Sequence, residues 1–87
     1  MRQAPEFFGD IELVLLYIAK KLREAKAVEQ VLTAGGLDYA VEADRYKGGF
    51  LFPSERIGAF FYVTDESLER ARTLLRDNGY KPYELEF

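Results

Sequence analysis

The 87-residue chain contains no cysteine, no histidine and no tryptophan. The absence of cysteine excludes disulfides, thiolate metal sites, iron–sulfur clusters and cysteine nucleophiles. The absence of histidine removes the commonest zinc ligand and the commonest general base near neutral pH. Because only carboxylates, lysine, tyrosine and serine remain for catalysis, we expect a non-enzymatic protein without catalytic residues, metal sites or cofactors.

Positive charge and long apolar runs are scarce as well. The 12 lysines and arginines stand against 15 aspartates and glutamates, which gives a net charge of -3. Such a chain attracts phosphate backbones and anionic lipids only weakly. The longest apolar run, residues 13–19, is too short to span a bilayer, and residues 1–10 lack the apolar centre of a signal peptide. We therefore expect a cytoplasmic protein that binds neither nucleic acid nor membrane.

Apolar residues make up 48% of the chain, which is enough for one small hydrophobic core. Residues 1–10 show no periodicity and include Pro5 and Gly9, a pattern that predicts an N-terminal tail whose phenylalanines can pack back on the domain. Residues 11–87 are predicted to form a single domain. A domain of this size has a thin stability margin, which oligomerisation commonly supplements.

Four segments have the composition of β-strands. Residues 11–19 and 57–63 are almost continuously apolar, as strands buried on both faces are. Residues 39–44 and 83–87 alternate apolar with acidic residues, which is typical of half-buried edge strands. The sequence therefore predicts two inner and two outer strands.

Two further segments have helical patterns. Residues 23–34 combine strong helix formers with one apolar side and are followed by Gly35 and Gly36, which end the helix because glycine adopts the left-handed cap conformation without a steric penalty. The second helix is predicted to begin at a capping oxygen supplied by Thr64 and Asp65 and to end at a C-cap of Asn78-Gly79. One alternative remains open, because residues 10–34 also fit a single long amphipathic helix.

The ranking of the strands by hydrophobicity predicts the topology. In a ferredoxin-like sheet the order is four, one, three, two, which places the first and third strands in the centre. The expected fold class is thus α+β, a ferredoxin-like βαββαβ two-layer sandwich with four antiparallel strands and both helices on one face. The other face would carry an apolar patch of the kind that marks interfaces. For this homodimer interface we predict Leu15, Tyr17, Phe60 and Tyr62.

Residues 46–56 are predicted to be the connector between the second and third strands, and they are unusually aromatic for a loop. Two glycines provide a hinge, and Lys47 with Arg56 could hold an anion. Phe50 to Phe52 could instead fold over the domain's own core or continue the hairpin. As candidate ligand-binding or partner-binding residues we name Tyr46, Lys47, Gly48, Gly49, Phe50, Phe52 and Arg56.

Several short segments together resemble a known family. They are Leu16-Tyr17-Ile18-Ala19, Glu24-Ala25, Val31-Leu32-Thr33-Ala34-Gly35-Gly36-Leu37, Tyr39-Ala40-Val41 and Glu69-Arg70-Ala71. In these segments the chain is similar to a family of small prokaryotic signal-transducing proteins of unassigned function with a PII-like, ferredoxin-like fold. The resemblance implies a regulatory or adaptor role. PII-like proteins carry their signalling loop between strands two and three, which corresponds here to residues 46–56.

Two hypotheses of function follow. The first is a small non-enzymatic regulatory or protein-interaction domain, signal-transducing or adaptor-like, that forms a homodimer or higher homo-oligomer and binds a protein partner that the sequence does not identify. The second is a small-molecule sensor that binds an anionic metabolite at residues 46–56 or between subunits. An enzyme that uses tyrosines and carboxylates is the remaining alternative.

Overall fold

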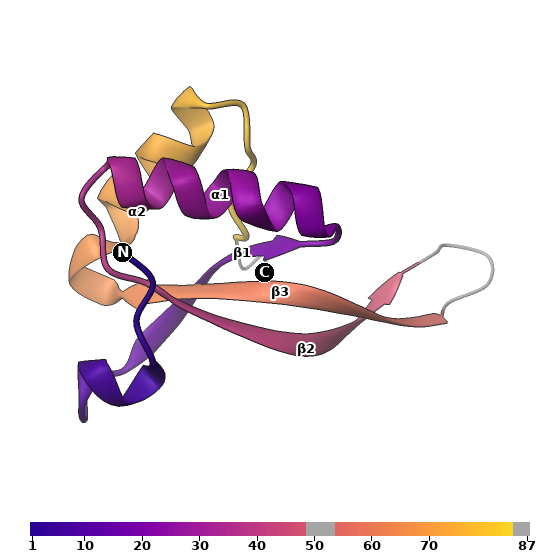
Figure 1. Cartoon of the computed structure of the whole chain (residues 1–87), viewed down its shortest axis with the longest axis horizontal. Helices are drawn as coiled ribbons and strands as arrows, with labels where there is room; N and C mark the ends of the chain where they lie inside the picture. Colours follow the sequence, from indigo (N-terminus) through magenta and orange to yellow (C-terminus); the bar gives the residue numbers. More distant parts are fainter. Residues whose placement is uncertain (49–53, 85–87) are drawn as a thin grey trace.

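The computed structural model describes residues 1–48 and 54–84. Within them two α-helices lie on one side of a three-stranded antiparallel sheet (Figure 1). The expected α+β class is confirmed. In chain order the elements are the 3-10 helix η1, strand β1, helix α1, strands β2 and β3, the 3-10 helix η2 and helix α2. Their bounds are Pro5–Phe8, Leu13–Ala19, Leu22–Ala34, Ala40–Gly48, Ser54–Thr64, Asp65–Ser67 and Leu68–Asp77.

The sheet has the order β1-β3-β2, and β3 pairs antiparallel with both neighbours. β1 and β2 are therefore parallel to each other, and α1 connects them by crossing over β3. A fourth strand is not shown, because residues 81–84 form no strand and residues 85–87 lie outside the described residues. One backbone contact lies where such a strand would pair: the N–H of Tyr83 donates to the carbonyl oxygen of Leu16 at 2.8 Å.

The ends of the helices follow from local chemistry. α1 begins at Leu22, after β1 has ended, so the alternative of one helix over residues 10–34 is wrong. Gly36, just beyond its end, has a φ of 75°, which glycine adopts without the steric penalty of a side chain. At the end of β3 the hydroxyl of Thr64 accepts a hydrogen bond from the N–H of Ser67 at 3.3 Å and caps the turn that leads into α2.

A β-bulge in β1 determines which side chains face the helices. Leu15 pairs with Tyr62 and Tyr17 pairs with Phe61, so Leu16 is an extra residue in the ladder. In such a bulge two successive side chains lie on the same side of the sheet. Leu16 and Tyr17 consequently both face the helices. The predicted position of Tyr17 on the helix-free face is wrong, because simple alternation does not anticipate the extra residue.

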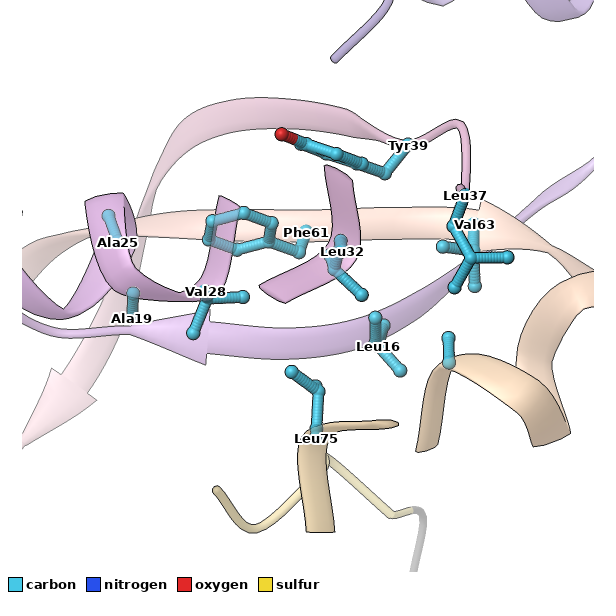
Figure 2. Packing of buried hydrophobic residues seen from close by; sticks show 11 residues of the cluster. Leu16, Ala19, Ala25, Val28, Leu32, Leu37, Tyr39, Phe61, Val63 and Leu75 are labelled. Atoms are coloured by element: carbon cyan, nitrogen blue, oxygen red, sulfur yellow. The ribbon is translucent and has the colours of Figure 1, made fainter. Parts of the chain in front are cut away.

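The hydrophobic core lies between the sheet and the two helices (Figure 2). Phe61 of β3 is fully buried at its centre, with its ring centroid 6.0 Å from that of Tyr39 and 6.5 Å from that of Tyr17. Burying side chains of this size stabilises the fold by about 1.5–3 kcal/mol each. The hydroxyl of Tyr39 remains satisfied, 2.9 Å from the Thr33 hydroxyl. The other fully buried members of the cluster include Leu16, Val28, Leu32, Val63, Ala71 and Leu75.

β2 and β3 continue as a two-stranded ribbon beyond the helices (Figure 1), and we call residues 44–48 and 54–58 the arm. Residues 46–48 and 54–56 were expected in a connector, but they are strand, so the predicted connector is wrong for them. The alternatives for Phe50 to Phe52 fall outside the described residues. Each further residue pair of the arm continues the β2–β3 hydrogen-bond ladder in the register that these strands already have in the core. A diagonal ion pair of Arg45 with Glu55, at 3.4 Å, lies on the same ribbon.

The N-terminal segment lies against the domain. The N–H of Gln3 donates to the carbonyl oxygen of Tyr39 at 2.8 Å, and Arg2 forms a parallel bridge with the same residue. Phe8 is 7% exposed whereas Phe7 is 57% exposed. Of the two phenylalanines expected to pack back, only Phe8 therefore does so.

Gly58 provides a test of the arm's geometry. A methyl group on Gly58 would lie 3.0 Å from the carbonyl oxygen of Ala19 and 3.0 Å from a ring carbon of Tyr46. We expect Gly58→Ala to lower the free energy of unfolding by about 1–3 kcal/mol, the usual cost of overpacking. Urea denaturation followed by circular dichroism measures the change. In a Tyr46→Ala background the same substitution should cost less, and an equal cost in both backgrounds would contradict this contact.

Candidate functional site

Three alanines form a row across the sheet, at right angles to the strands. Ala19 of β1 pairs with Ala59 of β3, which pairs with Ala43 of β2. Since residues two apart on a strand share a face, this row lies on the same side as Phe61, the side that the helices cover. Alanine side chains are the shortest that a sheet can present apart from glycine. The row is therefore the floor of a depression.

Bulkier residues form the two walls of this depression. One wall is the first turns of α1, where Leu22 is 72% exposed, and the other is the arm, where Ile57 is also 72% exposed. The volume between them is about 330 Å³, and we call it the arm groove. Its described lining residues are Arg2, Ala19, Lys20, Lys21, Leu22, Ala25, Glu29, Val41, Ala43, Ile57, Gly58 and Ala59.

The charged residues of the arm groove are mainly positive. Lys20 and Lys21 lie at its β1 end, and Arg2 approaches from the N-terminal segment beside β2. Glu29 is the one carboxylate among the described lining residues, and its Oε1 lies 3.7 Å from Arg2 Nη1. Three cationic residues and one carboxylate thus line the groove of a chain whose net charge is -3, although the ammonium of Lys20 itself lies over the Tyr46 ring. The local potential is opposite in sign to that of the whole chain.

Lys20 connects the groove to the other face of the arm. Its Nζ lies 5.6 Å from the centroid of the Tyr46 ring, a cation–π distance. The ring of Tyr46 in turn lies against the backbone of Gly58, where any side chain would displace it. The turn after β1 is thus attached to the arm, which positions the cationic end of the groove relative to Ile57.

The half-buried Tyr17 and the buried Tyr39 are hydrogen-bond donors rather than bases. Burial raises the pKa of Tyr17 well above its usual value, and a 2.7 Å hydrogen bond to the Glu24 carboxylate raises it further. Burial also raises the pKa of Tyr39. Both phenols therefore keep their protons at neutral pH, and the hydrogen bond of Tyr17 holds the first turn of α1 on the sheet.

Of the candidates predicted at 46–56 whose side chains the structure describes, Tyr46 and Arg56 are not among the lining residues of the arm groove. Tyr46 pairs with Arg56 and position 47 pairs with Glu55, so positions 47 and 56 belong to opposite faces of the ribbon. This register does not bring them together around one anion. The predicted candidates Gly49, Phe50 and Phe52 lie outside the described residues.

Three of the four residues predicted for a dimer interface lie on the helix-free face. Leu15 and Tyr62 are a cross-strand pair and are each half-buried, whereas Phe60 is only 9% exposed. Burial raises the pKa of Tyr62, and the charges of Glu42 and Asp44 add to this. The helix-free face is consequently acidic along β2 and less exposed than the sequence suggested.

Sequence analysis did not identify the arm groove. The alanines of its floor belong to no sequence motif that indicates a binding site. Its walls include Leu22 and Ile57, and large aliphatic residues of this kind are usually expected in a hydrophobic core. The one feature of the sequence that could have indicated the groove is that positions 43, 57 and 59 lie on the same face of the β2–β3 hairpin. Using it requires the register of β2 with β3 and the length of α1, neither of which periodicity gives.

In residues 1–48 and 54–84, neither helix combines the length and the apolar character that crossing a membrane requires. The same residues contain no group of three or more His, Cys, Asp or Glu side chains placed to hold a metal ion.

Comparisons with protein-family models, curated proteins and solved structures found no match to this chain. The proposals below therefore rest on the geometry of the arm groove.

The raised pKa of Tyr17 predicts a pH dependence of stability. As the pH rises through about 10 the unfolded chain releases the Tyr17 proton while the folded chain retains it, so the free energy of unfolding decreases. Below that pH the contribution is fully present. We expect Tyr17→Phe to lose stability less steeply than the wild type in alkali, as measured by urea unfolding at a series of pH values. Glu24→Gln should reduce the slope partly, and identical alkaline slopes for wild type and Tyr17→Phe would refute the assignment.

Proposed function

We propose that the chain is a non-enzymatic protein-interaction domain of the regulatory or adaptor kind and that the arm groove is its docking surface. The observation that carries this proposal is that Leu22 and Ile57, each 72% exposed, line the same groove from opposite sides. Two large, exposed aliphatic side chains beside an apolar floor are typical of a surface that contacts a partner.

The energetics support a reversible interaction. Covering Leu22 and Ile57 contributes about 1.5–3 kcal/mol for each side chain. Association costs about 4–15 kcal/mol in lost translational and rotational freedom, so these two contacts need others around them. The cationic residues and the outer edge of the arm, which pairs with no further strand among residues 1–48 and 54–84, can supply polar contacts. Such a combination suits regulatory binding better than a permanent interface.

The proposal includes the ferredoxin-like fold and the regulatory role that the family resemblance implies. The order β1-β3-β2 and the 2.8 Å bond from Tyr83 to Leu16 support a fourth strand beside β1.

Homodimerisation is the simplest form of the interaction, with the groove in place of the helix-free face as its main surface. We place the protein in the cytoplasm, as its composition suggests.

A second candidate function is a sensor of a small anionic metabolite. The volume of about 330 Å³ and the pair Lys20 and Lys21 favour this alternative at the arm groove rather than at Lys47 and Arg56. A thermal-shift screen over nucleotides, amino acids and carboxylates distinguishes the two functions. A specific small ligand raises the melting temperature in proportion to the logarithm of its concentration over its affinity.

The docking proposal predicts a separation of binding from stability. We expect Leu22→Ser with Ile57→Ser to abolish self-association and the binding of an apolar dye while the urea midpoint stays close to that of the wild type, because both side chains are exposed. Sedimentation velocity and dye fluorescence measure the two effects. The matched control Ile11→Ser, at a residue 61% exposed outside the groove, should retain both activities.

Two results would contradict this prediction. A wild-type protein that is monomeric at high micromolar concentration and binds no dye has no docking surface. Dispersal of a wild-type dimer by Leu15→Lys, with the groove variant still dimeric, would place the interface on the helix-free face instead.

A further inference from the structure

We infer that the arm groove recognises an extended segment of a partner protein in which an apolar anchor is flanked by acidic residues. This inference rests on the proposed docking function and specifies the chemistry of the partner. Three features of the groove carry it: its width, the positions of its cations and its position at the edge of the sheet.

The width of the groove excludes a helix. Rows of side chains on one face of a sheet are about 7 Å apart along the strands, and the floor is the alanine row with Val41 of the next row on one side and Ile57 on the other. A helix with its side chains is about 10–12 Å across. The volume of about 330 Å³ is at the lower end of ligand pockets. One or two apolar side chains from an extended segment therefore fit, and a helix does not.

The cations lie at both ends of this narrow floor. The alanine row runs from β1 to β2, with Lys20 and Lys21 directly following Ala19 at the β1 end. Arg2 lines the groove from beside β2, where Glu29 only partly offsets its charge because the Arg2 side chain is 58% exposed. Ala19 at the β1 end is only 1% exposed, so a segment seated on Ala43 and Ala59 would have Lys21 toward one end and Arg2 toward the other. Acidic residues on both sides of the anchor complement this arrangement.

The groove is also accessible from the β2 side. Ala43 is exposed at the outer strand of the described sheet, and the N-terminal segment pairs with β2 only around Tyr39. A partner chain can thus enter the groove from the edge without displacing a secondary-structure element. Specificity then depends on the sign of the charges that flank the anchor.

Three synthetic peptides test this inference. Each contains the same Leu-Phe anchor, with two residues on either side that are all Glu, all Gln or all Lys. Titration of the isotope-labelled full chain, followed by amide chemical shifts, reports affinity and location together. We expect shifts at Leu22, Ala43 and Ala59, with the Glu peptide bound about tenfold more tightly than the Lys peptide at low salt and a smaller ratio at high salt.

Two variants identify the cause of the selectivity. Lys20→Glu with Lys21→Glu should reverse the order of the peptides. The control Lys26→Glu with Lys81→Glu changes the net charge equally at residues that do not line the groove, and it should retain the wild-type order. Ala43→Leu fills the floor at an exposed position and should abolish binding of all three peptides.

The outcomes separate this inference from the proposed function. Equal binding of the three peptides at the groove would overturn the acidic partner and leave the docking function standing. Absence of groove shifts with every peptide, together with a monomeric wild type that binds no apolar dye, would overturn both. Reversal of the peptide order by the Lys26 and Lys81 control would show a general charge effect and would likewise overturn the inference.

Discussion

β3 pairs with β2 over residues 54–62 and with β1 over residues 59–64, and this double register determines where the other features lie. Its central residue Phe61 meets Tyr17 on one side and Val41 on the other, which produces the thickest part of the core. Two residues earlier, Ala59 meets two alanines, and two residues earlier again Ile57 extends into solvent. Phe61 in the core, Ala59 in the groove and Ile57 in the arm thus occupy successive positions on one face of β3. A shift of one residue in this register would turn all three to the opposite face.

The groove arises from a difference in length between strand and helix. The 13 residues of α1 span about 20 Å, whereas the 11 residues of β3 span about 36 Å. The helix layer therefore ends before the sheet does. Sequence analysis located the uncovered apolar surface on the helix-free face of the sheet. The structure places the most exposed aliphatic side chains of the sheet region, Leu22 and Ile57, on the helix side, beyond the start of α1.

The parts of the fold that depend on neighbouring residues could be predicted. The ends of α1, the cap at Thr64 and the strands around Leu16 and Phe61 all follow from local conformational preference and hydrophobic pattern. The bulge at Leu16 could not be predicted, because it depends on pairing with a strand about 45 residues away along the chain. The length of the arm and the alanine row depend on the same pairing. The candidate site therefore depends on the long-range pairing of the strands, which local sequence patterns do not predict.

The small side chains of the groove leave apolar surface uncovered. Larger apolar residues at Ala43 and Ala59 would bury more surface beside Leu22 and Ile57, and the sequence elsewhere uses such residues freely on both inner strands. The three alanines instead leave two exposed aliphatic side chains without partners in the described fold. The arm that carries Ile57 is held by pairing between two strands and by the contact of Lys20 with Tyr46, so it has fewer stabilising contacts than the core. A partner that fills the groove would contact α1 and the arm together, and its binding would therefore stabilise the least supported part of the sheet.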